Sequence, residues 1–419
     1  MTKLMLSMVP IAAANVLFGF FNHGYIFLEV GPGIQTDAFY AGMAVPQLVL
    51  SVLTGALFYV VVPLLAGEDE EQLSQGVWGF FFLVGGFVGA FALGLFILAT
   101  FWVPLLLPGF SHEGLSLCVQ LTRIQLVGMV FSALNCVLRA AYHARQNFFW
   151  PEFSQLMESV VGLGALVWAL PIFGIYAAAA VYVLRAILLT LLLLPGLGSY
   201  SNLDWRSLVI RRAWSRMKPL AFAALYYKSG PLVDRFLTSM TPAGGLSLFY
   251  FSQQLYEAAN HLIGRAVAGP VLPLLAVHKK SGKPGLFKRT YRARLLVVLG
   301  VGVATVVLFL VLVEPLLRLR QEIDDEGVRV FWWITVGLAG FFIGGAMGQV
   351  LSSAFYAQGD VQTPTQVGII GFTLGIGLKV IGFLLSGLLG IAVATSFYYM
   401  GNALAMYLLL ERKDDALSD

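Results

Sequence analysis

The chain has 419 residues, of which 58% are hydrophobic and only 11% are charged, and its formal net charge is +4. A soluble domain has about 25% charged residues, so composition excludes a water-soluble fold for this chain. Long apolar runs recur from one end to the other, and a helix of about 20 apolar residues crosses the roughly 30 Å of hydrocarbon in a bilayer. The sequence therefore predicts an all-α polytopic membrane protein.

Twelve transmembrane helices are predicted from the apolar runs and the polar breaks between them. The first six spans are 5–30, 37–66, 73–103, 117–143, 151–173 and 174–198, and the second six are 217–240, 245–277, 294–317, 328–358, 364–387 and 389–410. The first run is too long for a cleaved signal peptide, so it is counted as a span. We expect two six-helix bundles, an N-terminal one over residues 1–200 and a C-terminal one over residues 201–419.

The positive charges are distributed unevenly between the predicted loops. With twelve spans both termini lie on one side, and that side holds seventeen of the 26 Lys and Arg residues, against three on the other and six within spans. The positive-inside rule then places both termini in the cytoplasm. The basic stretches 206–218 and 279–294 could also suit nucleic acid, but beside membrane spans they indicate topology and contact with anionic lipid.

No catalytic or cofactor-binding pattern occurs. The sequence has no GxSxG, HExxH or GxxxxGK[ST] motif, which disfavours an intramembrane hydrolase and an ATP-driven pump. Cys118 and Cys136 lie in apolar stretches without metal-ligand spacing around them. We therefore expect a transporter that is not an enzyme and that binds neither a cofactor nor a structural metal.

The two halves of the chain resemble each other. Residues 138–151 (LRAAYHARQNFFWP) match residues 351–364 (LSSAFYAQGDVQTP) without a gap at an offset of 213. Residues 174–184 also match residues 390–400, at an offset of 216, and Pro63-Leu-Leu-Ala matches Pro273-Leu-Leu-Ala. Because each half has an even number of spans, the halves enter the membrane in the same orientation, as parallel repeats that could rock about a shared cavity.

Charged residues inside the spans propose the substrate path, because a charge in hydrocarbon costs about 2.5–3.5 kcal/mol and should face a cavity or a partner. Glu257, His261 and Arg265 are spaced i, i+4, i+8 on one helix face. Gly230-Pro231 should interrupt the seventh span between Lys228 and Arg235. The proposed path consists of Asp37, Lys228, Asp234, Arg235, Gln254, Glu257, His261 and Arg265, with Arg123, Glu158 and Arg185 as secondary positions.

Each of these positions also has a structural explanation. Asp37, Asp234 and Arg235 lie near predicted span ends, where their side chains could reach interfacial water. Glu257 and Arg265 are too deep for that, but they could form an ion pair that bridges neighbouring helices. The sequence leaves both explanations open beside the functional one.

Three stretches resemble the MviN/MurJ family of lipid II flippases, within the multidrug/oligosaccharidyl-lipid/polysaccharide exporter superfamily. They are 36–66 (TDAFYAGMAVPQLVLSVLTGALFYVVVPLLA), 245–276 (GLSLFYFSQQLYEAANHLIGRAVAGPVLPLLA) and 355–364 (FYAQGDVQTP). The resemblance implies two six-helix bundles around a cavity that opens alternately to each side. It also implies an undecaprenyl-linked sugar pyrophosphate as substrate, driven by the membrane potential or by a Na⁺ or H⁺ gradient, and it matches Asp37 to the family's second-helix aspartate.

The chain departs from the family pattern at the cations. Family members usually have arginines in the first helix and in the second, whereas residues 10–27 and 46–50 contain none here, and Gln253-Gln254 replaces an aspartate-arginine pair. Lys228, Arg235 and Arg265 could supply the positive charge that a pyrophosphate requires in a low-dielectric cavity.

Three functions are compatible with these residues. The leading hypothesis is a flippase for a lipid-linked saccharide in the bacterial cytoplasmic membrane, acting as a monomer. The second is an ion-coupled exporter of cationic drugs, in which Asp37, Glu158 and Glu257 bind the cation or a proton. The third is a membrane scaffold that has lost transport.

Overall fold

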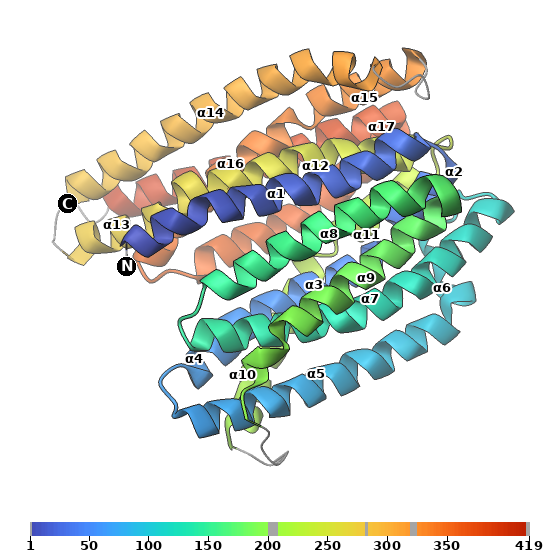
Figure 1. The fold of residues 1–419 in the computed structure, drawn as a ribbon. Coiled ribbons are helices and arrows are strands. Elements are labelled where there is room, and N and C mark those ends of the chain that lie inside the picture. The colour runs from blue at the N-terminus through green and yellow to red at the C-terminus, as the bar shows by residue number, and fades with distance from the viewer. Residues whose placement is uncertain (1, 200–207, 281–283, 319–324, 416–419) are drawn as a thin grey trace. The chain divides into compact units, whose positions relative to one another are not determined.

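The computed structural model describes residues 2–199, 208–280, 284–318 and 325–415, and within these ranges its regular elements are helices (Figure 1). The chain divides into two compact units. The helices of the first unit are α1 (Thr2–Val30), α2 (Ile34–Gly42), α3 (Ala44–Ala56), α4 (Val62–Leu65), α5 (Glu70–Ile97), α6 (Ala99–Leu106), α7 (His112–Ala144), α8 (Phe149–Phe173), α9 (Ile175–Leu193), α10 (Leu208–Tyr227) and α11 (Gly230–Ser239). The second-unit helices are α12 (Gly245–Ile263), α13 (Gly269–Lys280), α14 (Pro284–Arg318), α15 (Asp325–Gly337), α16 (Ala339–Ala357) and α17 (Gln362–Asp415). Two π-helical turns, Leu57–Val61 and Gly264–Ala268, and one 3₁₀ turn, Leu194–Leu197, complete the set.

Nine helical segments of the described residues are long and apolar enough to cross a membrane. The last one, Gln362–Lys413, contains a kink at Ser386 and Gly387 and therefore corresponds to two predicted spans. The predicted spans 217–240 and 245–277 are not among the nine. Their helices are interrupted and rich in polar residues, as expected where helices border a polar path rather than lipid.

The first compact unit comprises Met1–Leu246, and α7 is its central helix. Helix α7 packs against α2, α3, α5 and α9. Helix α8 packs against α1 on one side and against α9 on the other (Figure 1). Helices α10 and α11 pack against α3, which explains why this unit extends to residue 246. The boundary between residues 200 and 201 that the sequence predicts falls outside the described residues, and the two six-helix bundles stay a prediction.

The second compact unit comprises Ser247–Asp419, and α16 is its central helix. Helix α16 packs against α13, α14 and α17. The approach to α17 is close because Gly344 has no side chain: a Cβ there would lie 2.7 Å from the backbone of Tyr399. Small residues of this kind let membrane helices approach each other closely.

The two turns that the sequence match aligns have a similar backbone conformation. Gln146 (φ 59°) and Gly359 (φ 79°) are 213 residues apart and both adopt the left-handed conformation. The next residues, Asn147 and Asp360, each accept a hydrogen bond from the backbone N–H three positions later, at 3.3 and 3.0 Å. The two halves therefore build the same capped turn with different residues.

The second sequence match needs a correction of its register. Gly174 and Gly387 have nearly the same backbone conformation, with φ of 60° and 56°, and they are again 213 residues apart. The matching of Gly174 to Gly390, at an offset of 216, is therefore displaced by three residues. Gly390 has another use, because it packs directly on the backbone of Gly382 where the two arms of α17 meet.

Candidate functional site

Asp37 lies in the first turn of α2 and is buried, with 4% of its surface exposed. Its carboxylate accepts a hydrogen bond from the backbone N–H of Gly244 at 2.7 Å. Gly244 has a φ of 93°, so glycine suits this turn, which immediately precedes α12. Asp37 thus links the second helix to a turn 207 residues later in the chain.

The seventh predicted span is broken where the sequence indicates. Helix α10 ends at Tyr227 and α11 begins at Gly230, with Pro231 in its first turn. Lys228 lies in the break, and its ammonium donates to the backbone carbonyl of Ser51 at 2.6 Å. This bond directs a cation toward α3 at the point where the helix is interrupted.

Asp234 and Arg235 are both buried in α11, and Arg235 has only 1% of its surface exposed. Together with Asp37, they were open to the explanation that charged side chains near span ends reach interfacial water. Burial excludes that explanation for all three residues. A buried charge needs compensating partners, so each marks a position where polar structure lies inside the fold.

Glu257, His261 and Arg265 are exposed side chains of the second unit. The Gln254 side-chain amide donates to the Glu257 carboxylate at 3.2 Å. Arg265 lies in the π-helical turn that follows α12, so the predicted i, i+8 stack does not rest on one continuous α-helix. The wider turn rotates Arg265 relative to the α-helical face of the other two residues.

Glu158 and Arg185 are brought together, whereas the third secondary position lies elsewhere. The Arg185 guanidinium donates to the two Glu158 carboxylate oxygens at 2.7 and 3.3 Å, which joins α9 to α8. Arg123 instead donates to the Phe96 carbonyl at 3.2 Å and lies 5.2 Å from the Phe96 ring centre. The first pair is internal to the unit, and Arg123 anchors α7 to the end of α5.

The Glu158–Arg185 pair lines a cavity of about 290 Å³ inside the first unit. Asn22 of α1 and Asn135 of α7 also line it, and they have 3% and 4% of their surface exposed. Their amide nitrogens donate to backbone carbonyls, but their Oδ1 atoms have no hydrogen-bond partner among the described residues. These oxygens can accept hydrogen bonds from water or from another donor in the cavity.

Sequence reasoning missed the uncharged members of this cavity because, in the first half of the chain, it considered only charged residues. Asn15 and Asn22 are seven residues apart in an apolar helix, and this spacing places both on the side of α1 that contacts α8. It also left out Lys379, a buried lysine of α17. Among the described residues, no group of His, Cys, Asp and Glu is arranged to bind a metal ion.

A sequence model of the lipid II flippase MurJ family matches residues 29–418, which is nearly the whole chain. The chain belongs to this family. The probable lipid II flippase MurJ of Buchnera aphidicola is 23% identical over 393 residues, covering 89% of this chain and 76% of the relative. The lipid II flippase MurJ of Burkholderia cenocepacia is 22% identical over 366 residues, covering 81% and 70%.

Solved structures agree on the fold of this MurJ family member. A lipid II flippase MurJ in an inward closed conformation has a TM-score of 0.83 at 18% identity, covering 97% of this chain and 88% of that one. An inward-facing multidrug resistance MATE family transporter has a TM-score of 0.73 at 13% identity, covering 98% and 95%. The chain is therefore a multi-pass helical membrane protein and a transporter rather than an enzyme, and the family resemblance of its sequence is confirmed.

Proposed function

We propose that this protein translocates a lipid-linked saccharide across the bacterial cytoplasmic membrane by alternating access. The substrate is lipid II or another glycan linked to undecaprenyl pyrophosphate. The observation that supports this proposal is the family match over residues 29–418. The buried charges of α2 and α11 are a second support, because such charges in a membrane transporter are typical of a substrate path.

The proposed protein has twelve spans in two six-helix bundles, with both termini in the cytoplasm. The uneven distribution of Lys and Arg supports this topology. The shared turn geometry at Gln146 and Gly359 supports two repeats in the same orientation. Such bundles can tilt against each other and expose the path to one side of the membrane at a time, and a monomer suffices for this motion.

Three cations of the path substitute for the arginines that the first two helices lack. Lys228, Arg235 and Arg265 would interact with the pyrophosphate, whose negative charge must be compensated away from bulk water. Asp37, Asp234, Gln254, Glu257 and His261 supply the remaining polar groups of the proposed path. The membrane potential or a Na⁺ or H⁺ gradient drives the translocation.

The test is translocation of an undecaprenyl pyrophosphate-linked saccharide by the purified protein in liposomes. We expect the double variant Arg265→Ala with Lys228→Ala to lose transport. The matched control is Arg318→Ala, because Arg318 is an exposed arginine paired with Glu314 at the surface. Wild-type activity in the double variant would refute the assigned cations, and a wild-type protein that moves no polyprenyl pyrophosphate would refute the flippase.

The similarity to MATE transporters defines the alternative outcome. An exporter of cationic drugs would use carboxylates rather than cations, and Glu257 is an exposed carboxylate of the proposed path. If drug transport is seen and Glu257→Gln abolishes it, while Arg265→Ala leaves it intact, the exporter replaces the flippase. If no substrate changes the accessibility of either side, the protein is a scaffold.

A further inference from the structure

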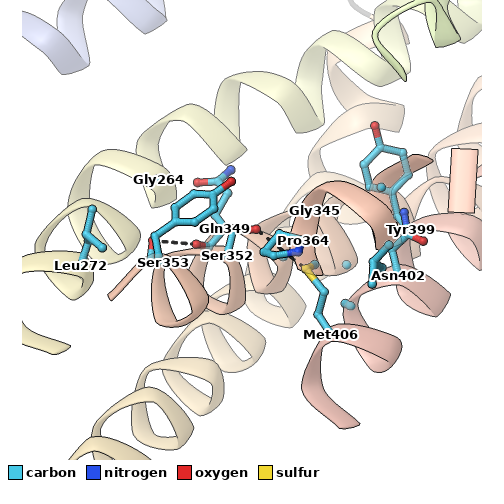
Figure 2. A pocket seen from close by; sticks show the side chains of 16 residues that line it. Gly264, Leu272, Gly345, Gln349, Ser352, Ser353, Pro364, Tyr399, Asn402 and Met406 are labelled. Carbon is cyan, nitrogen blue, oxygen red and sulfur yellow. Dashed lines mark hydrogen bonds between the residues drawn. The ribbon is translucent and has the colours of Figure 1, made fainter. Parts of the chain in front are cut away.

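A second cavity, of about 530 Å³, lies wholly inside the second unit (Figure 2). It is bounded by the start of the π-helical turn at Gly264, by α13, by the second half of α16, and by both arms of α17. Its volume falls within the roughly 300–1,000 Å³ range of sites that bind small molecules. None of the proposed path residues lines it.

The lining of this cavity is mostly apolar, with a few polar side chains and no charged one. Gln349 and Asn402 contribute amides, Ser352 and Ser353 contribute hydroxyls, and Tyr399 contributes an aromatic ring with a hydroxyl (Figure 2). Without Lys or Arg the cavity has no partner for a pyrophosphate, and without Asp or Glu it has none for a cationic drug. Its chemistry suits a neutral ligand that has apolar faces as well as hydroxyl groups, such as a sugar ring.

Gln349 is the clearest indication that the cavity holds a polar occupant. It lies in the Asp325–Ala357 segment, which is long and apolar enough to cross a membrane, yet its side chain is exposed. An amide that faces hydrocarbon without a hydrogen-bond partner costs several kcal/mol. Its exposure therefore indicates that the amide faces a cavity that water can enter rather than lipid.

Glycines leave room for both amides. A Cβ at Gly264 would lie 2.5 Å from Gln349 Oε1, and a Cβ at Gly371 would overlap the Asn402 amide. The Gln349 backbone carbonyl also accepts a hydrogen bond from Ser353 at 2.8 Å. Gly264 begins a π-helical turn, and such turns occur frequently at functional sites.

The repeat reinforces this assignment, because the first unit has a cavity among the corresponding helices. The first cavity uses α7, α8 and α9 and contains the Glu158–Arg185 ion pair, whereas the second uses α16 and the two arms of α17 and is uncharged. Residues 213 positions after Glu158 and Arg185 are Gly371 and Tyr398. The second half therefore has no ion pair at these repeat positions, and neither Gly371 nor Tyr398 lines the second cavity.

We propose that the second-unit cavity binds the saccharide of the lipid-linked substrate, with the Gln349 and Asn402 amides donating to and accepting from ring hydroxyls and Tyr399 packing against the sugar face. The proposal rests on the flippase function and adds a subsite for the neutral part of the substrate. Amide side chains donate and accept at once, which matches hydroxyl groups better than any charged residue does. The cavity lies toward the turn at residues 358–361, the end assigned to the cytoplasm, so it would receive the sugar before translocation.

The test compares binding of two probes to the full chain in nanodiscs: undecaprenyl pyrophosphate alone, and undecaprenyl pyrophosphate bearing a disaccharide. Gln349→Leu removes the amide at nearly constant volume. We expect it to weaken binding of the disaccharide probe about tenfold, the effect of one or two lost hydrogen bonds, and to leave binding of the sugar-free probe unchanged. Gln366→Leu is the matched control, because Gln366 is an exposed glutamine of α17 outside the lining.

A second variant fills the cavity from another side. A Cβ at Gly348 would lie 3.5 Å from the Met406 methyl group and no closer to anything else, so Gly348→Val should fold and occupy sugar volume. It should reproduce the selective loss of the disaccharide probe. Equal losses for both probes, or no loss with either variant, would overturn the saccharide subsite while leaving the flippase function intact.

Two further outcomes separate the inference from the function on which it rests. A wild-type protein that binds neither lipid probe overturns both the subsite and the flippase. A wild-type protein that binds the free soluble disaccharide as tightly as the lipid-linked one assigns the cavity to a free sugar and overturns the lipid-linked assignment.

Discussion

The ion pair between Glu158 and Arg185 allows a quantitative test of how the first unit is held together. Both Arg185–Glu158 contacts are within hydrogen-bonding distance, at 2.7 and 3.3 Å, and Arg185 also donates to the Ser159 hydroxyl at 3.2 Å. The Glu158 and Arg185 side chains are 8% and 21% exposed. Removal of one partner from such a pair leaves a poorly solvated charge, and the free energy of unfolding typically falls by about 3–5 kcal/mol.

We therefore expect Arg185→Met to lower the free energy of unfolding by about 3–5 kcal/mol. The double variant Arg185→Met with Glu158→Leu should recover most of this loss, because two apolar side chains of similar length replace the pair without an isolated charge. The measurement is denaturant-induced unfolding of the purified protein in detergent micelles, for both single variants and the double variant.

The control for this cycle is the exposed pair of Arg318 and Glu314, whose side chains are both more than half exposed. Its disruption by Arg318→Met should cost less than about 1 kcal/mol, because water screens the charges. If Arg185→Met costs no more than Arg318→Met, the pair does not stabilise the unit. If the double variant loses the sum of the two single losses, the two side chains act independently and the reasoning is wrong.

Three further predictions concern local structure. Gly162→Ala should lower the free energy of unfolding by about 1–3 kcal/mol, because the new Cβ would lie 2.4 Å from the Arg185 side chain. The control is Gly164→Ala on the same helix, where a Cβ meets nothing, and it should be neutral or stabilising in the same unfolding assay. Gln146→Gly should stabilise by about 0.5–1 kcal/mol in thermal unfolding, because its φ of 59° strains any side chain, and an unchanged midpoint would contradict this. Hydrogen bonds from the Lys413 ammonium and from a backbone N–H lower the pKa of Asp360 from 3.8 to about 2, so its contribution to stability is present above pH 4 and is lost as the pH falls toward 2. Asp360→Asn should remove this small acid-dependent step from the unfolding midpoint, and an identical pH profile in the variant would refute the assignment.

Much of the fold could be predicted because every segment that crosses hydrocarbon must be a long apolar helix. The apolar runs identified the nine segments of the described residues that are long and apolar enough to cross a membrane, and the break at Gly230-Pro231 followed from proline chemistry. The repeat was found at residues 138–151 because Leu138, Ala141, Ala144 and Pro151 recur without a gap in the second half, although the turn residues themselves differ. The second match was placed three residues off because short apolar words such as Gly-Ile recur by chance, whereas only the backbone identifies Gly387 as the partner of Gly174.

The site was less predictable, because a sequence shows which residues are charged but not which ones meet. Glu158 and Arg185 are 27 residues apart and pair, while Arg123 contacts the backbone of another helix. The cavities depended on Asn22, Asn135, Gln349 and Asn402, uncharged residues that a search for charges passes over. Polar side chains of any kind inside apolar spans would have been the better signal.

The two arms of α17 stay in contact well beyond the kink at Gly387. Gly382 packs on the backbone of Gly390 next to the kink, and farther along the hairpin Gly375 and Gly371 leave room for the Tyr398 and Asn402 side chains. Small residues of this kind let membrane helices approach each other closely. Because Asn402 lines the second-unit cavity and Gly371 does not, the spacing of the arms beside the cavity depends on a glycine outside its lining.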